Sequence, residues 1–568
     1  MSEIILSPGV FQIESDQSLY TQAPPVLGAA IVGPTVSGRP YVPTYVTTYS
    51  QYLSLFGDVF KSGSYYYEYF TSQAAKEYFS NGGQTLLVTR IISGSANIET
   101  YATSSVIAKD ASISFELETL AWGNQMNSVS PEVSGALASG SAYNVRWEVT
   151  NVNSGSNGGT FTIVVRRGDD NNAQKNILET WANVSLDPML PNYISRVIGD
   201  LKPVYDVTNK YVNYTGSFSN ASQYVRVKSV TTPNVDSIDN NGNYKSASYA
   251  DSLPVVASGS FGGGVADTKD AKKMNENISD GTTPTNNIQG FTNADYKLAF
   301  NLLSNKDEYQ FNVLLAPGAG INSDMIATCE GRGDAIAITD AGKYGTSITG
   351  ATTAAAGQSS NYAATYYPWI QLYSNNLGRV AWCPPSTVIG GVLAFNDQVG
   401  AEWFAPAGLN RGGVPSVIRA ERRLQQTDRD TLYTGNVNPL ATFPGTGVCV
   451  WGQKTLQRKP TALDRVNVRR LLIALKEYIG GVSRNLVFEQ NTTVTRNSFL
   501  ARVNPYLESV VQRQGLYAYK VIMDETNNTA DVVDRNQLVG QIYIQPTKTA
   551  EFIILNFNIL PTGATFPA

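Results

Sequence analysis

The sequence contains no histidine, and this absence excludes several classes of active site. Ser-His-Asp and Cys-His arrangements, H-E-x-x-H zinc sites and the usual general base near neutral pH all require an imidazole. A pair of carboxylates for glycoside cleavage needs no histidine, but such a pair cannot be recognised from linear spacing. The residues therefore indicate no catalytic, cofactor or metal site, and we expect that the protein is not an enzyme.

Cysteine and charge are also scarce. Cys329, Cys383 and Cys449 are odd in number and far apart, which predicts reduced, buried thiols rather than a disulfide framework or a metal site. Charged residues make up 15% of the chain, with 42 basic against 46 acidic residues. Because no basic stripe is present to displace counterions from phosphates, we do not expect nucleic-acid binding.

Long apolar runs and a basic leader are missing as well. No apolar run approaches the roughly 18 residues of a membrane-spanning helix, so no direct membrane span is expected. The first residues, MSEIILSPGVFQIE, contain neither a basic cluster nor a sustained apolar segment. They do not have the pattern of a secretory signal.

Glycine and tyrosine are plentiful, with 49 and 32 residues in a chain of 568. Together with many Ser, Thr and Asn residues they favour sheet-rich domains with frequent turns. Tyrosine also suits contact surfaces, because it combines a wide apolar ring with a polar tip. A chain of this length predicts about three to four domains.

The order of the patterns predicts a multidomain α+β chain, in which a β-rich region interrupts an α/β framework. Residues 67–83 have apolar side chains at helical spacing, and the strand-like QTLLVTRII follows at once. Alternating runs such as YNVRWEVTNV, separated by polar turns, characterise the interruption. The expected segments are an N-terminal arm (1–24), a middle α/β domain in two parts (25–95 and 290–435), one or two β-rich inserted outer domains (96–289) and a C-terminal α+β domain (436–568).

The C-terminal domain contains the clearest helix pattern, in TALDRVNVRRLLIALKEYIGG. Thr461 with Asp464 resembles a capping box, and Gly480 with Gly481 predicts the helix end. A second helix is expected over 496–514, followed by strands in YAYKVIM, LVGQIYIQP and EFIILNFNIL.

The last of these strands needs a partner. In EFIILNFNIL, one face of the strand is apolar, while Asn556 and Asn558 make the other face partly polar. The residues on the apolar face are Ile553, Leu555, Phe557 and Ile559. The partner is either the sheet of the same domain or the sheet edge of a neighbouring molecule, and the pattern leaves both open.

Two short motifs are better explained by chance. The segment GTGVCVWGQKT nearly spells a phosphate-binding loop, but Gln453 separates Gly452 from Lys454 and moves the lysine out of register. The tripeptide within Gly331 to Asp334 matches a cell-adhesion motif, but it lies between a predicted helix and a buried strand. Neither motif indicates a binding function.

Several motifs occur in an order that resembles one known family, the contractile tail sheath proteins of myovirus-type bacteriophages. The resemblance covers residues 1–95 and 290–568, and the inserted region resembles nothing. The matching motifs are Ser7-Pro8-Gly9-Val10, Phe56-Gly57, Asn81-Gly82-Gly83 ahead of Val88-Thr89-Arg90, Tyr367-Pro368-Trp369, Pro384-Pro385-Ser386, Trp403 with Ala405-Pro406-Ala407, Trp451-Gly452 and Asn467-Val468-Arg469-Arg470.

The resemblance implies a mechanism. Hexameric rings would stack around the tail tube, with baseplate and tail terminator proteins as further partners. Contraction from a metastable extended state would drive the tube through the host envelope. The subunit would be assembled in the host cytoplasm and would reside in the virion tail. Terminal strands would pair with neighbouring subunits through Val10, Phe11, Ile13, Ile553, Leu555, Phe557 and Ile559, with hinges at Pro8, Gly9 and Pro546.

The family analogy places the C-terminal domain against the tube. A tube-facing basic surface could comprise Lys454, Arg458, Lys459, Arg465, Arg469 and Arg470. The alternative, that these charges are solvated or paired within the chain, is equally open. Two other functions also remain: the sheath of an R-type bacteriocin or related injection machine, and a glycan-cleaving virion enzyme in the insertion.

Overall fold

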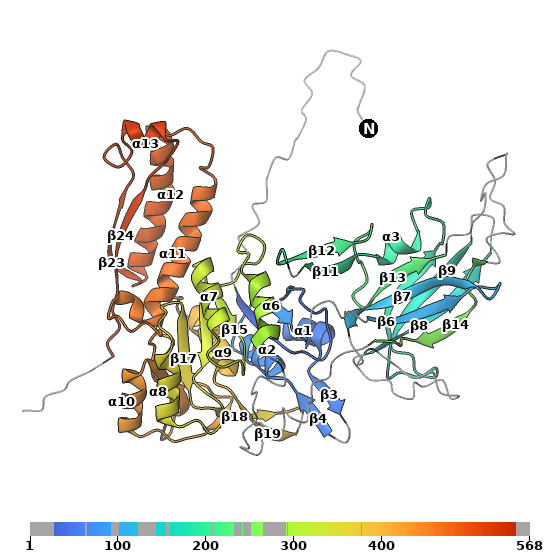
Figure 1. Cartoon of the computed structure of the whole chain (residues 1–568), viewed down its shortest axis with the longest axis horizontal. Coiled ribbons are helices and arrows are strands. Elements are labelled where there is room, and N and C mark those ends of the chain that lie inside the picture. The colour runs from blue at the N-terminus through green and yellow to red at the C-terminus, as the bar shows by residue number, and fades with distance from the viewer. Residues whose placement is uncertain are drawn as a thin grey trace, which may run out of the picture.

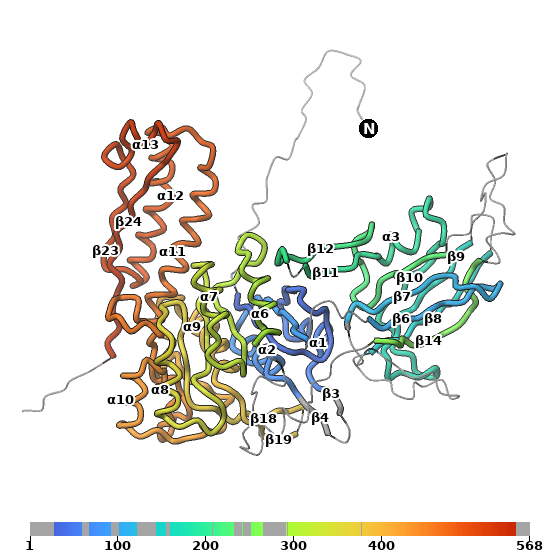
Figure 2. The backbone as a smooth tube through the Cα atoms, viewed as in Figure 1, coloured from blue at the N-terminus to red at the C-terminus, as the bar shows by residue number. Residues whose placement is uncertain are grey.

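The structure is a computed structural model that describes residues 28–62, 65–92, 101–122, 126, 144–154, 159–206, 208–231, 241, 252–264, 291, 293–376 and 378–551. These residues form three parts that lie in a row, with an α/β layer in the middle (Figure 1). A β-rich part lies on one side of this layer and a pair of long helices with a small sheet lies on the other. The backbone trace shows the same row (Figure 2).

The central layer is built on an eight-stranded sheet, in the order β2-β5-β1-β15-β16-β17-β21-β22. The two edge pairings, β2 with β5 and β21 with β22, are antiparallel, and the other pairings are parallel. The strands are β1 (Ala29–Gly33), β2 (Thr44–Val46), β5 (Leu86–Arg90), β15 (Val313–Leu315), β16 (Ile336–Asp340), β17 (Ala363–Tyr367), β21 (Val437–Phe443) and β22 (Gly447–Val450).

Helices cover both faces of this sheet, which explains its nearly continuous apolar strands. Alternate side chains of β1 point to opposite faces, so that Ala30 and Val32 join one apolar cluster while Ala29 and Ile31 join the other. The first cluster includes side chains of α6 (Asn293–Leu303), α7 (Ser323–Arg332), α8 (Ile348–Ala356) and α10 (Gln426–Thr434). The second includes side chains of α1 (Tyr49–Phe56), α2 (Phe70–Ser80) and α9 (Ser386–Val399).

The sheet joins segments that are far apart in the sequence. Strand β1 pairs with β5 on one side and with β15 on the other, across the long β-rich interruption. Strand β17 pairs with β21, so the layer continues past residue 435, where the sequence patterns place the domain boundary. The patterns missed this because the partner of β21 in the sheet, β17, lies about 70 residues earlier in the sequence. Two smaller sheets flank the layer: β3 (Val59–Ser62) with β4 (Tyr65–Glu68), and β18 (Ile370–Ser374) with β19 (Arg379–Cys383) and β20 (Val417–Ala420).

The β-rich part has its own core. One sheet has the order β10-β9-β8-β14, a second has the order β13-β7-β6, and apolar side chains of both form one cluster in which the Phe115 and Phe161 rings stack at 5.4 Å. This cluster supports the predicted β-rich insertion. The elements are β6 (Tyr101–Ile107), β7 (Ile113–Trp122), β8 (Val145–Asn153), β9 (Thr160–Arg167), β10 (Ile177–Val184), α3 (Ile194–Ile198), β11 (Lys202–Asp206), β12 (Tyr211–Thr215), β13 (Val225–Val230) and β14 (Ala257–Ser260).

The C-terminal part is a helical hairpin with a two-stranded sheet packed along it, as Figure 1 shows. Its elements are the short 3-10 helix Ala462–Asp464, α11 (Val466–Arg484), α12 (Thr493–Gln512), β23 (Leu516–Ile522), α13 (Ala530–Asp534) and β24 (Gln541–Pro546). Thr461 does cap a helix, but it is the 3-10 helix, where its hydroxyl accepts from the Leu463 amide. Both predicted helices and the first two predicted strands are confirmed.

The predicted end of the first helix is wrong. Gly480 and Gly481 lie inside α11, which continues to Arg484. Each glycine weakens the helix by about 1 kcal/mol relative to alanine. Tertiary packing offsets this, because Ile479 and Val482 on either side of the glycine pair contact the apolar cluster between the helices and the small sheet. Among the residues that the structure describes, no helix is both long and apolar enough to cross a membrane.

Buried charges stabilise the β-rich part, and they yield a first prediction. The Arg166 guanidinium, which is fully buried, donates to Asp170 at 2.7 and 3.0 Å and to Glu148 at 2.9 Å. Asp170→Ala would leave Arg166 and the buried Arg146 with too little negative charge. We expect the free energy of unfolding of the β-rich part, measured with urea, to fall by about 3–5 kcal/mol.

The matched control is Asp531→Ala, which removes a pair with Arg535 whose side chains are 69% and 64% exposed. Exposed pairs contribute little, so the urea midpoint should not change measurably. Equal destabilisation by both variants would contradict the argument from burial.

Candidate assembly interface

Most of the residues expected to link subunits lie outside the described part of the chain. They are Pro8, Gly9, Val10, Phe11, Ile13, Ile553, Leu555, Phe557 and Ile559. The structure instead describes the C-terminal sheet and the segment that leads from it to residue 551. This region is where an interface with a second subunit can be examined.

The sheet formed by β23 and β24 is open at both edges among the residues described. The two strands are antiparallel, with Tyr519 opposite Ile544 and Val521 opposite Ile542, and these four side chains pack on the helices. An isolated two-stranded sheet is marginally stable, and an unpaired edge presents a row of N–H and C=O groups. Both edges can therefore accept a further strand.

The other face of this small sheet is exposed and aromatic. Tyr517 and Tyr543 are 65% and 56% exposed, and Tyr543 lies opposite Lys520 across the strand pair. Tyrosine in this setting suits contact with another protein surface, because its ring is apolar and its hydroxyl remains hydrated.

The predicted hinge at Pro546 is the last paired residue of β24, opposite Leu516. The next residue is also held, because the Thr547 amide donates to the Gly515 carbonyl at 3.2 Å and its hydroxyl donates to the Gln514 carbonyl at 2.7 Å. A hinge at Pro546 stays a prediction, and these bonds place the first unpaired backbone after Thr547.

Four residues further on, a carboxylate fastens the segment to the α/β layer. The Arg465 guanidinium donates to both carboxylate oxygens of Glu551, at 2.7 and 3.0 Å. The Tyr433 hydroxyl of α10 also donates to this carboxylate, and the Gln453 amide donates to it at 3.1 Å and to the Thr549 hydroxyl at 2.6 Å. We call Glu551, Arg465, Tyr433 and Gln453 the Glu551 clamp.

The electrostatics of the clamp favour a charged Glu551. Burial alone would raise the pKa of this carboxyl, but the hydrogen bonds from Tyr433 and Arg465 outweigh burial and hold its pKa below the usual range. Burial and the neighbouring carboxylate raise the pKa of Tyr433, so its hydroxyl remains a donor. Burial, together with repulsion from Arg465, lowers the pKa of Lys454, whose ammonium lies 4.0 Å from the centre of the Tyr433 ring.

The six basic residues expected to face the tube do not form one surface. Arg469 and Arg470 are each only 3% exposed. Arg469 stacks over Tyr362 with 4.1 Å between the guanidinium carbon and the ring centre, and Arg465 belongs to the clamp. Lys454 is half-buried, whereas Arg458 and Lys459 are exposed. Contact with the tube stays a prediction. Within the set of six, Arg458 and Lys459 are the residues exposed enough to make it.

Arg470 fastens the C-terminal helices to the α/β layer. Its guanidinium donates to both oxygens of Asp397, which lies on α9, at 2.7 and 2.5 Å. Arg470 also lies near the Glu402 carboxyl, whose pKa is raised, chiefly by burial. A bidentate pair of this kind fixes orientation as well as distance.

The motifs explained by chance have structural roles. Lys454 donates to the Tyr433 carbonyl at 2.9 Å, and Arg332 is buried and paired with Asp334 at 2.9 Å. The three cysteines are free and buried, as predicted. The described residues contain no cluster that could hold a metal ion.

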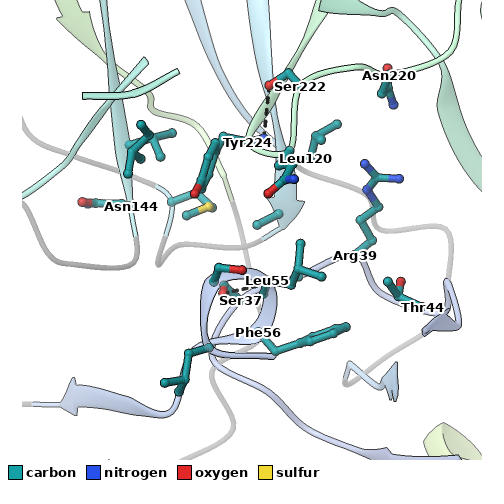
Figure 3. A pocket seen from close by; sticks show the side chains of 18 of the residues that line it. Ser37, Arg39, Thr44, Leu55, Phe56, Leu120, Asn144, Asn220, Ser222 and Tyr224 are labelled. Carbon is teal, nitrogen blue, oxygen red and sulfur yellow. Dashed lines mark hydrogen bonds between the residues drawn. The ribbon is translucent and has the colours of Figure 1, made fainter. Parts of the chain in front are cut away.

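A cavity of about 550 Å³ lies where the β-rich part meets the α/β layer (Figure 3). Arg39 and Phe56 line it from the layer, and Leu120, Asn220 and Tyr224 line it from the β-rich part. Burial and the nearby Arg226 lower the pKa of Arg39. No sequence pattern indicated this cavity, because its lining comes from several distant segments.

Comparisons with known proteins agree with the resemblance. Residues 289–456 match the model of the phage tail sheath protein central domain, and residues 458–560 match that of the phage tail sheath C-terminal domain. The break between the two models follows β22, so it agrees with the sheet rather than with a boundary at residue 435. These two matches support a contractile phage tail sheath protein.

Two curated relatives are named tail sheath proteins. The one from Vibrio phage KVP40 is 38% identical over 208 residues, which is 37% of this chain and 31% of the relative. The one from Enterobacteria phage T4 is 41% identical over 192 residues, or 34% of this chain and 29% of the relative. The matches thus span less than a third of each relative's length.

The fold has a counterpart among solved structures. The crystal structure of a sheath tail protein from Listeria innocua has a TM-score of 0.50 with this chain and 10% sequence identity. The similarity covers 92% of this chain and 95% of that protein. At this identity the comparison supports the fold alone.

The difference in burial and pairing among the six basic residues leads to a second prediction. Arg470→Met would leave Asp397 without its partner beside the partly buried Glu402. We expect a loss of about 3 kcal/mol of stability, at the low end for a buried pair because Asp397 is 29% exposed. Thermal unfolding of the purified chain measures it.

Arg458→Ala combined with Lys459→Ala provides the comparison, since both side chains are exposed. This double variant should unfold at the parent temperature. A stable Arg470→Met protein would show that the pair with Asp397 does not hold the C-terminal helices.

Proposed function

We propose that the chain is the structural subunit of a contractile tail sheath, which polymerises as stacked hexameric rings around the tail tube. The observation that carries this proposal is the open sheet of β23 and β24, next to a C-terminal segment with a strand pattern. A donated strand from a neighbouring subunit would complete this sheet through main-chain hydrogen bonds. The two matched family models and the names of the relatives support the same role.

The donated strands would be residues 7–14, as the family resemblance implies, and 551–560, where Ile553, Leu555, Phe557 and Ile559 share one face in the sequence pattern. Main-chain pairing depends little on how the rest of the neighbour is placed, so the links could persist while the subunits reorient. In this way a metastable extended sheath could contract without dissociating. Contraction would require no nucleotide, and the proposed role is not enzymatic.

The partners follow from this role. The C-terminal part would face the tail tube, with Arg458 and Lys459 as exposed basic contacts. The β-rich insertion would lie on the outside, and the ends of the sheath would meet baseplate and terminator proteins. The assembled sheath would belong to the virion tail.

A truncation after Glu551 tests the role of the terminal strand. This variant keeps the described sheet, the helices and the Glu551 clamp. We expect the full chain to form wide hollow tubes in electron micrographs, and the truncated chain to stay folded but dispersed, because its link is missing.

Either of two results would contradict the proposal. Tubes of normal appearance from the truncated chain would mean that other surfaces hold the assembly. Loss of the folded state, measured by circular dichroism, would mean that the strand belongs to its own domain.

Amide hydrogen exchange gives a test without mutation. In dispersed subunits, the amides of β23 and β24 that point away from the partner strand should exchange fast, because nothing protects them. In assembled tubes they should become protected, while the amides of the fully buried strand β16 remain slow in both states. Unchanged exchange at β23 and β24 on assembly would argue against strand addition there.

A further inference from the structure

We propose that Glu551 is a positioning residue for the C-terminal linking strand, and that its clamp gives the strand two alternative pivots. This inference rests on the proposed function, because it describes how the linking strand leaves its own subunit. With the clamp closed, Glu551 is the last fixed residue before the linking strand. With the clamp open, Thr547 is the last fixed residue before it.

The clamp is a built site rather than a surface contact. Its carboxylate is gripped by side chains from three separate places: Tyr433 on α10, Gln453 after β22, and Arg465 just before α11. The side chains of Arg465 and Glu551 are 25% and 18% exposed. All the donors belong to the α/β layer or to its junction with α11, whereas β24 belongs to the C-terminal part. The segment between them therefore bridges the two parts.

Each cationic or aromatic member of the clamp has a second partner, so opening leaves no buried charge unpaired. The Arg465 guanidinium also lies 2.9 Å from the Asp464 carboxylate. The Tyr433 ring keeps the ammonium of Lys454, and that ammonium keeps its hydrogen bond to the Tyr433 carbonyl. Glu551 itself would become hydrated. The pair of Arg470 and Asp397 is different, because opening it would separate the two parts of the chain.

The second pivot follows from the bonds of Thr547. Its amide and hydroxyl remain tied to Gly515 and Gln514 when the clamp opens. When the hydrogen bond between Gln453 and Thr549 breaks as well, four residues, 548–551, lie beyond the last fixed residue. At about 3.5 Å per extended residue they add roughly 14 Å of reach. A linking strand could follow a neighbour that moves away by this distance without losing its pairing.

The closed clamp also restricts the direction in which the strand leaves. A segment whose origin and direction are restricted loses less conformational entropy when it finds its acceptor edge. A closed clamp should therefore increase the rate at which free subunits first add strands to one another. The link between the subunits is formed by the strand and not by the clamp.

The test uses the full chain with spin labels at Thr427→Cys, on α10, and Ala550→Cys. Both positions are exposed, and the native cysteines are buried. In this labelled parent we expect one narrow distance distribution by pulsed electron paramagnetic resonance. Glu551→Gln and Tyr433→Phe should broaden it, with its long-distance edge moved outward by up to about 10 Å, the reach of three residues. Glu525→Gln is the matched control, because it removes an exposed carboxylate of the same domain and should leave the distribution unchanged.

Assembly of the same samples is followed by light scattering and electron microscopy. Glu551→Gln should form tubes of normal appearance several-fold more slowly than the parent. An unchanged distance distribution in Glu551→Gln would overturn the clamp, and a broadened one with a parental assembly rate would overturn its positioning role. If the parent forms no tubes, the proposed function fails, and the distance measurement still decides whether the clamp exists.

Discussion

The structure depends on one constraint, which is that a parallel sheet must be covered on both faces. Strand β1 pairs with β5 from the early part of the chain and with β15 from beyond the β-rich interruption. Its two faces are covered by helices that come from both of these parts of the chain. Each pairing therefore depends on the other. The β-rich part has a separate apolar cluster, so it can be attached to this layer without entering its strand order.

The β-rich part and the C-terminal part, at the two ends of the row, differ in how fully their sheets are covered. The β-rich part closes its core with two sheets that face each other, whereas the C-terminal part exposes tyrosines on a sheet of two strands. The pair of Arg470 and Asp397 connects this second part to the layer, and the Glu551 clamp is a second, more exposed connection. The same two parts are thus connected by the pair of Arg470 and Asp397 and by the Glu551 clamp, and we propose that only the clamp opens.

Sequence patterns predicted the helices whose apolar periodicity is strong, α2 and α11, and the buried thiols. They misplaced the end of α11, because a pair of glycines usually ends a helix unless packing on both sides carries it further. They could not predict the Glu551 clamp or the pairing of Arg470, since both join residues far apart in the sequence. They did indicate the family, because its motifs follow one another along the chain, and they grouped six basic residues that the fold then separated into buried and exposed sets.

The independence of the β-rich part has a consequence for protein engineering. None of its strands enters the eight-stranded sheet, and its main contacts with the layer include the stacked rings of Tyr41 and Tyr205, 5.7 Å apart. Tyr101, Tyr205 and Val212 of this part also belong to the apolar cluster of the layer, so a replacement domain would have to supply apolar neighbours in their place. An exchange for a foreign compact domain should then leave the strand order of the layer unchanged.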